Sequence, residues 1–199
     1  MPPPPIALPQ LRTVPFDPSR RAVDGTFRGS RHCRSLGDDR TTVIDRPLGA
    51  GEWDLVRSFV RRTAREDLRL RFGRPLNFDD EATLRRAFDL RAESGDVIWV
   101  LDDDAAIAAI AHRITLSRSE AEIALIVRSD VQRRGIGEFL LRQALARSAR
   151  AGLKTLTGLV LWENRAMRRL AAKVGFVPGQ GSAWALELTL DIARARAAV

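Results

Sequence analysis

Apolar residues recur along residues 41 to 191 of this 199-residue chain with spacings that alternate between those of strands and helices. Helical spacing predicts four helices, and short apolar or alternating runs predict six strands. The predicted helices span 52–71, 81–93, 137–151 and 163–173. The predicted strands span 41–44, 97–101, 105–116, 121–127, 155–162 and 183–190. This order, a strand, two helices, three strands and then helix, strand, helix and strand, predicts one mixed α/β domain.

The two ends of the chain lack this pattern. Residues 1–40 contain seven of the ten prolines, many Arg and Ser, and no sustained apolar period, which predicts a flexible Pro/Arg-rich arm. The folded domain is expected at 41–191, with a short tail at 192–199. The opening segment has no basic and apolar signal pattern, and no run approaches the roughly 20 apolar residues of a membrane span. We therefore expect a cytoplasmic protein with no membrane partner.

Few residues could hold a metal ion. Cys33 is the only cysteine and His32 and His112 are the only histidines, so neither an internal disulfide nor a His/Cys metal centre is expected. The triplet Asp102–Asp104 follows a predicted strand. We interpret it as a solvated hairpin turn, with a metal site as the alternative.

The net charge of +8 raises the question of nucleic-acid binding. Lys154 and Lys173 are the only lysines, so 33 minus 2 leaves 31 arginines, and these are scattered along the chain. There is no tyrosine, and no aromatic residues interleave with a basic stripe to stack bases. Nucleic acid is therefore an unlikely partner, whereas an acidic small molecule or an acidic protein surface remains compatible with the charge.

A glycine turn, Gln132 to Gly137, joins a predicted strand to a predicted helix. Such a turn directs unpaired backbone N–H groups at one point, where the helix dipole adds partial positive charge. Arg133 and Arg134 add full charges, so the turn fits a diphosphate. The alternative is a plain strand-to-helix connection.

Three motifs follow one another in a fixed order: Q-R-R-G-I-G at 132–137, E-N-R-A-M at 163–167 and K-V-G-F at 173–176. With the predicted order of elements, they resemble the GNAT superfamily of acetyl-CoA-dependent N-acetyltransferases. Residues 121–127 and the pair Arg71-Phe72 look like those of Pat-type bacterial protein lysine acetyltransferases. The resemblance implies an α/β (α+β) fold with a mostly antiparallel sheet of about six or seven strands, helices on both faces, and a splayed strand pair that holds acetyl-CoA.

The resemblance also implies where acetyl-CoA binds. The pantetheine arm would lie along the end of one strand and be held by backbone groups of Leu125, Ile126 and Val127. The pyrophosphate would lie on the turn formed by Gln132, Arg133, Arg134, Gly135, Ile136, Gly137 and Glu138. Asn164 resembles a cofactor-contacting asparagine of the family, with an ordinary helix N-cap as the alternative.

Glu122 is the expected general base. A lysine amine, with a pKa of about 10.4, must lose a proton before it attacks a thioester. Alternation places Glu122 with Ala124 and Ile126 on one largely apolar strand face, where burial would raise the pKa of the carboxyl. The resemblance assigns a glutamate at this strand position as the base. The alternative is a glutamate that faces solvent.

Many members of the superfamily carry a tyrosine acid where this chain has Ala171, and the chain contains no tyrosine. This departure excludes a tyrosine acid and favours the protein lysine branch. The leading hypothesis is therefore acetyl transfer from acetyl-CoA to a protein lysine by direct attack. The alternatives are a small-molecule amine acetyltransferase, a non-catalytic acyl-CoA sensing module and, ranked last, nucleic-acid binding through the arm.

Overall fold

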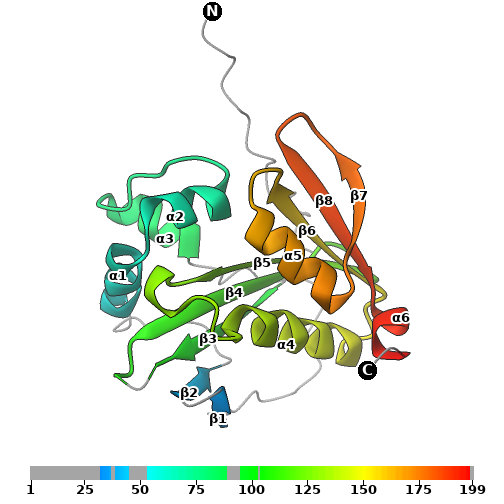
Figure 1. The fold of residues 1–199 in the computed structure, drawn as a ribbon, viewed down its shortest axis with the longest axis horizontal. Coiled ribbons are helices and arrows are strands. Elements are labelled where there is room, and N and C mark those ends of the chain that lie inside the picture. Colours follow the sequence, from blue (N-terminus) through cyan, green and yellow to red (C-terminus); the bar gives the residue numbers. More distant parts are fainter. Residues whose placement is uncertain (1–31, 37–38, 45–52, 89–94, 103, 198–199) are drawn as a thin grey trace, which may run out of the picture.

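The computed structural model describes residues 32–36, 39–44, 53–88, 95–102 and 104–197. These residues form one eight-stranded sheet with helices on both faces (Figure 1). The strands are β1 (His32–Leu36), β2 (Asp39–Ile44), β3 (Gly95–Leu101), β4 (Ile107–Thr115), β5 (Glu120–Val127), β6 (Thr155–Leu161), β7 (Val177–Gly181) and β8 (Ala185–Asp191). Their order across the sheet is β1-β2-β3-β4-β5-β6-β8-β7. Every neighbouring pair is antiparallel except β5 and β6, so the predicted mixed, mostly antiparallel fold is confirmed.

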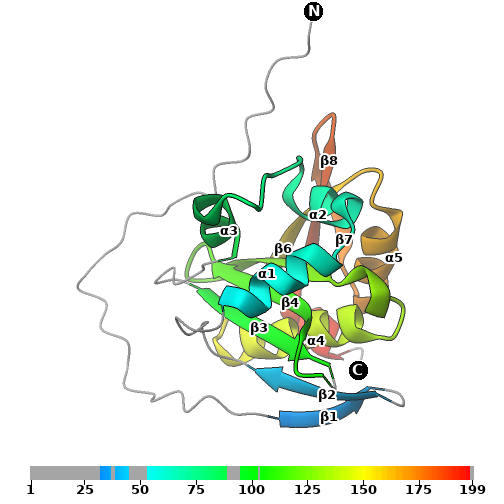
Figure 2. The same cartoon turned by 90° about the vertical axis from the view of Figure 1, so that its left-hand side faces the viewer.

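The helices divide between the two faces of the sheet. One face carries α1 (Trp53–Arg62), α2 (Arg65–Phe72) and α3 (Glu81–Phe88). The other carries α4 (Ile136–Arg150), α5 (Arg165–Val174) and α6 (Ile192–Ala197). Figure 2 shows α1 lying across β3 and β4 in front, with α4 behind the sheet. The sheet therefore separates two hydrophobic cores.

β5 contributes side chains to both cores. Ala121 and Ile123 lie in the core on the α4 side, whereas Ile126 lies in the core beneath α1, α2 and α3. Because strand side chains alternate between faces, Glu122 lies on the same face as Ile126, under α1, α2 and α3. The face predicted for Glu122 from the sequence is therefore correct.

The helix predicted over residues 52–71 is two helices. α1 ends at Arg62 and α2 begins at Arg65. At the break, the Thr63 hydroxyl donates to the Phe59 carbonyl, and the Ala64 N–H donates to Ser129 Oγ at 2.8 Å. This contact with a residue 65 positions away ends the helix, and no local pattern in the sequence shows it. α3 is described as far as Phe88, and the rest of the helix predicted over 81–93 lies outside the described residues.

The sheet is also larger than the six or seven strands expected. β1 lies inside the segment 1–40 that was expected to be an arm, and its sequence HCRSL shows no apolar alternation. β7 was not predicted because all five of its residues are exposed and it contains Pro178 and Gly179. α6 occupies most of the expected tail, while residues 1–31 and 198–199 lie outside the described part of the chain.

β5 and β6 pair over a short length and then separate. The paired residues are Glu120 with Thr155, Ala121 with Leu156 and Glu122 with Thr157. Gly158 permits the close approach at the end of this pairing, since a Cβ there would lie 3.1 Å from the Ile123 carbonyl oxygen. Beyond this point the edge of β5 that faces β6 has no strand partner among the described residues. The expected splayed strand pair is therefore present, with its apex at Glu122.

Candidate active site

Glu122 is the last residue of β5 that pairs with β6, so its carboxyl group stands where the two strands separate. Ile114 of β4 and Thr157 of β6 flank it on the neighbouring strands. Burial raises the pKa of Glu122 above its ordinary value; Arg71 of α2 opposes this, and Glu187 of β8 adds to it. No hydrogen bond contributes to this shift. The carboxylate is thus desolvated and free to accept a proton, as a general base requires.

The glycine turn and the first turn of α4 have the backbone geometry expected of an anion-binding site, and we call this region the cradle. Gly135 precedes the helix with φ of 86°, and Arg133 is also left-handed with φ of 63°. The first helical bond runs from the Phe139 N–H to the Gly135 carbonyl at 3.0 Å, and no side chain caps the helix. The amides of Ile136, Gly137 and Glu138 therefore have no helical acceptor and point out of a fifteen-residue helix. This geometry fits a diphosphate.

The charged side chains around the cradle leave it positive. Arg133 and Arg134 are exposed beside the turn. The Glu138 carboxylate accepts from Arg142 at 2.9 Å and pairs with Lys173 at 2.6 Å, and these two cations lower the pKa of Glu138. Because the acid is already paired with two cations, its charge does not oppose an incoming phosphate.

The side chain of Gln132 is turned toward α2. Its Nε2 donates to Asp67 Oδ2 at 2.9 Å and to the Val127 carbonyl at 3.2 Å. Asp67 also accepts a hydrogen bond from the Ser129 hydroxyl. These bonds connect α2 to the turn after β5, so the side chain of Gln132 stabilises the position of the cradle as a brace between the two elements. Asp67 and Ser129 were missed in the sequence because they belong to no motif and lie 62 residues apart.

Arg128 is a second brace that the sequence did not reveal. It follows β5 directly and is almost fully buried, with 1% of its surface exposed. Its guanidinium donates to Asp102 at 2.7 Å, to Asp130 at 2.6 Å and to the Ile107 carbonyl at 2.9 Å. Asp102, interpreted from the sequence as part of a solvated turn, is therefore paired with a buried cation; Asp103 lies outside the described residues. The bonds fix the point where β5 enters the cradle.

The backbone of Leu125, Ile126 and Val127 forms the open edge of β5, where the resemblance places the pantetheine arm. Their side chains point into the two cores, Leu125 and Val127 toward α4 and Ile126 toward α1. On the other edge the three residues pair with β4. Only backbone groups of this strand are thus presented to the space between β5 and β6, which fits strand-like binding of an extended amide chain.

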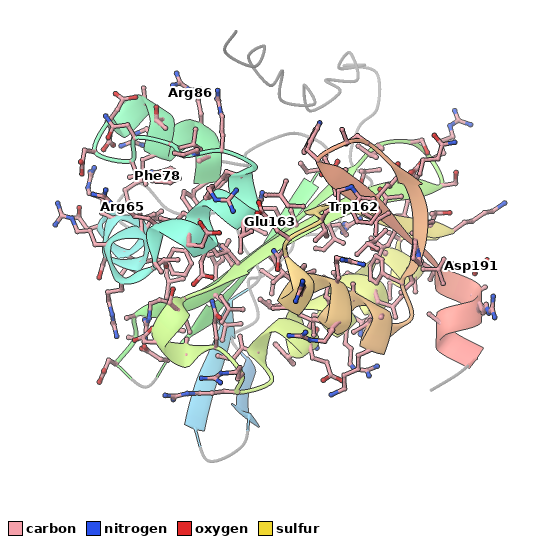
Figure 3. All side chains as sticks on the ribbon, turned by 45° about the horizontal axis from the view of Figure 1, so that its top comes forward. Arg65, Phe78, Arg86, Trp162, Glu163 and Asp191 are labelled. Atoms are coloured by element: carbon pink, nitrogen blue, oxygen red, sulfur yellow. The ribbon has the colours of Figure 1, made fainter. Side chains whose placement is uncertain are left out.

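Glu163 begins the second motif and lies between α2 and α5, where Figure 3 labels it. Its carboxylate pairs with Arg69 of α2 at 2.8 Å. Arg69 also pairs with Glu66 at 2.6 Å, and these two acids raise its pKa. The ion pair links α2 to the residue that follows β6. Because Asp67 of α2 also binds Gln132 after β5, α2 contacts the ends of both splayed strands.

Asn164 caps α5. Its Oδ1 accepts the Met167 N–H at 3.0 Å, which is the N-cap alternative considered for this residue. A contact of Asn164 with a cofactor stays a prediction. Ala171, at the position where many family members have tyrosine, is buried on α5 against the α4 core.

No group of three or more His, Cys, Asp or Glu residues within the described ranges could hold a metal ion. In the same part of the chain, no helix is both long and apolar enough to cross a membrane.

The fold and the site together define a class of α/β protein: a splayed, mostly antiparallel sheet with a glycine turn and an uncapped helix start after the central strand. The model of the acetyltransferase (GNAT) family matches residues 60–176, and the chain belongs to that family. GNAT acetyltransferases use acetyl-CoA as the acetyl donor, and residues 60–176 of this chain form an acetyltransferase domain of that family.

Two of the proteins that this chain is similar to carry the name Pat, one matched by sequence and one by fold. The chain is 26% identical over 157 residues to Acetyltransferase Pat of Mycolicibacterium smegmatis, a match that covers 68% of this chain but only 45% of the relative. The GNAT domain of S. lividans PAT shares the fold, with a TM-score of 0.65, 20% identity, and coverage of 75% of this chain and 90% of that one. Spermidine N-acetyltransferase from Vibrio cholerae, solved with CoA and spermine, has a TM-score of 0.61 and 18% identity over 77% of this chain and 98% of its own.

Proposed function

We propose that this protein transfers the acetyl group of acetyl-CoA to the amine of a protein lysine, with Glu122 as general base. The observation that carries the proposal is the position of Glu122. Its carboxylate stands at the apex of the splayed strands, partly desolvated and with no hydrogen bond that would hold it. A base in this place lies where the strand edge for the pantetheine arm ends.

Acetyl-CoA, the acetyl donor, would bind to two surfaces that are formed by backbone groups. The free amides of the first turn of α4 would bind the pyrophosphate, with Arg133 and Arg134 beside them. The open edge of β5, from Ile123 to Val127, would bind the pantetheine amides as an added strand. The amides of α4 lie beyond the Val127 end of β5, and Glu122 lies at the other end of the open edge. An arm that runs from the pyrophosphate along this edge would therefore bring the thioester near Glu122.

As general base, Glu122 would remove one proton from the substrate ammonium group. The lysine ammonium loses a proton to the carboxylate, directly or through one water, and the neutral amine attacks the thioester carbonyl. A C–N bond forms and the C–S bond breaks. As the adduct collapses, the coenzyme A thiolate leaves and the second amine proton passes to it through solvent. A thiol with a pKa of about 8.5 is an adequate leaving group, so no tyrosine acid is needed.

Two features support a protein lysine as acceptor. The relative that matches over 157 residues is named Pat, and the tyrosine position holds a buried alanine. Glu187 stands near Glu122 on the same side of the sheet, so the acceptor side is negative and attracts a cationic amine. That charge also suits a polyamine, and the likeness to spermidine N-acetyltransferase keeps a small amine as the second candidate.

The base is tested by Glu122→Gln, which keeps the shape of the side chain and removes the proton acceptor. We expect kcat to fall about 100-fold or more, while the Kd for acetyl-CoA in calorimetry stays unchanged. Glu120→Gln, two residues earlier on the same strand face, is the matched control and should keep wild-type turnover. Wild-type kcat for Glu122→Gln at every pH would remove Glu122 from the mechanism.

The acceptor is tested by comparing kcat/KM for folded proteins, lysine peptides, spermidine and spermine at equal acetyl-CoA. A protein lysine acetyltransferase should prefer a protein substrate by about 100-fold or more over every small amine. The opposite preference would support the polyamine alternative. Tight coenzyme A binding with no turnover on any acceptor would instead indicate a sensing module.

A further inference from the structure

We propose that Arg71 and His112 form a positioning pair that keeps Glu122 ionised in its desolvated site. This inference rests on the proposed role of Glu122 as base. It adds two residues that touch neither the cofactor cradle nor the strand edge for pantetheine, and it assigns them a joint electrostatic task.

Arg71 lies near the end of α2 and extends over the sheet face that carries Glu122. Its Nη2 is 3.3 Å from His112 Nδ1, and its guanidinium carbon lies 4.8 Å from the centre of the Phe72 ring. His112 stands on β4 opposite Ala124 and is 3% exposed. It packs edge-on to Phe88, with ring centres 6.3 Å apart. The guanidinium of Arg71 therefore contacts the Phe72 ring and the buried imidazole of His112.

The contact with Arg71 fixes the tautomer of His112. An arginine only donates hydrogen bonds, so His112 Nδ1 must accept and the ring proton must reside on Nε2. Burial, and then the charge of Arg71, lower the pKa of His112 well below its usual value. The ring is thus neutral at physiological pH. It orients Arg71 without cancelling its charge.

Arg71 acts on Glu122 through space. Burial lowers the pKa of Arg71 to about 10, while Glu122 is the acid that raises it. In return, Arg71 lowers the pKa of Glu122 against the larger effect of burial. The interaction between Arg71 and Glu122 is purely coulombic, with no hydrogen bond between the guanidinium and the carboxyl group. The cation therefore favours the carboxylate form yet leaves its oxygens free for the substrate proton.

The charged and titratable groups on the sheet face of Glu122 come from four elements. They are Arg71 of α2, His112 of β4, Glu187 of β8 and Glu120 on β5 itself. Arg71 is the cation among them, and His112 is neutral. Removing the charge of Arg71 leaves burial and Glu187 acting together on Glu122, and both favour the protonated acid, which cannot accept a proton.

The test is the pH dependence of kcat/KM in Arg71→Met, Arg71→Lys and the wild type. We expect Arg71→Met to move the acid limb of the profile to higher pH, so that it loses several-fold more activity at about pH 6 than at about pH 8. Arg71→Lys retains the charge and should rescue most of the loss at low pH. His112→Phe keeps a ring in the aromatic site but removes the acceptor, and should shift the limb in the same direction. The control is Arg74→Met, an exposed residue on the same segment, which should leave the profile unchanged.

A second measurement separates this inference from the proposed base. The carboxyl carbon of Glu122, followed by carbon-13 NMR without substrate, reports its ionisation whether or not the residue acts in turnover. An upward shift of its titration in Arg71→Met, with full activity in Glu122→Gln, would support the coupling and overturn the base. An unmoved titration, with activity reduced equally at all pH values, would give Arg71 a structural role and overturn the inference.

Discussion

Gly135 and Gly152 stand at the two ends of α4 with nearly the same left-handed backbone, φ of 86° and 74°. At neither residue would an added Cβ meet any atom within 4 Å. The two positions therefore differ in little except location. Gly135 shapes the cradle at the start of the helix, and Gly152 lies in the turn after its end, next to β6.

Comparing substitutions at Gly135 and Gly152 separates the effect of the cradle on acetyl-CoA binding from the effect of backbone strain on stability. Alanine in the left-handed region costs about 1 to 2 kcal/mol, so Gly135→Ala and Gly152→Ala should lower the free energy of unfolding by similar amounts in urea titrations. Only Gly135→Ala changes the direction of the amides at the helix start. We expect its Kd for acetyl-CoA to rise about tenfold or more in calorimetry, while Gly152→Ala keeps the wild-type Kd. Equal Kd values for the two variants would show that the pyrophosphate binds elsewhere.

The buried guanidinium of Arg128 supports a prediction on stability. Arg128→Met removes the cation and leaves Asp102 without its partner, and breaking a buried pair in this way costs about 3 kcal/mol or more. The loss should appear in urea unfolding. The KM for acetyl-CoA should also rise, because Arg128 fixes the start of the cradle. Arg61→Met, on the exposed face of α1, is the control and should change the stability by less than about 0.5 kcal/mol. A loss for Arg128→Met as small as that of the control would mean that the pair adds little.

The sequence predicts those features of the fold and the site that are set by residues close together along the chain. The glycine turn, the cap at Asn164 and the alternation around Glu122 are set by neighbours along the chain, and all three are present in the structure. The break between α1 and α2 was missed because its cause, Ser129, lies 65 residues away. β7 was missed because an edge strand needs backbone pairing with β8 and no buried side chain. Asp67, which accepts a hydrogen bond from Gln132, and the buried Arg128 depend on tertiary contacts, so one sequence does not reveal their roles.

Asn164 has two possible roles that substitution can separate. Asn164→Ala removes the acceptor of the Met167 N–H and should lower the free energy of unfolding by about 1 kcal/mol. Asn164→Asp keeps that acceptor but lacks the amide donor, so stability should stay close to the wild type. If Asn164 also contacts acetyl-CoA through its amide, Asn164→Asp should weaken the Kd in calorimetry. An unchanged Kd with intact stability would reduce Asn164 to a helix cap.

The raised pKa of Glu122 predicts how stability depends on pH. Its folded pKa lies above the ordinary 4.5, so between these two values the folded state binds the proton more tightly than the unfolded chain does. The contribution of Glu122 to stability is therefore complete at low pH and is lost as the pH rises through the folded pKa. Glu122→Gln cannot ionise, so it should match the wild type near about pH 4 and become more stable than the wild type toward neutral pH.

Urea unfolding of both proteins across this pH range measures the difference directly. Glu138→Gln supplies a control of opposite sign, because Lys173 and Arg142 lower the pKa of Glu138. The wild type should gain stability over Glu138→Gln as the pH rises, while it loses stability relative to Glu122→Gln. A difference between the wild type and Glu122→Gln that is flat in pH would show that the folded site does not disfavour the Glu122 carboxylate. The stability gained by Glu122→Gln at neutral pH then measures how much an ionised carboxyl group at the apex of the splayed strands destabilises the folded protein.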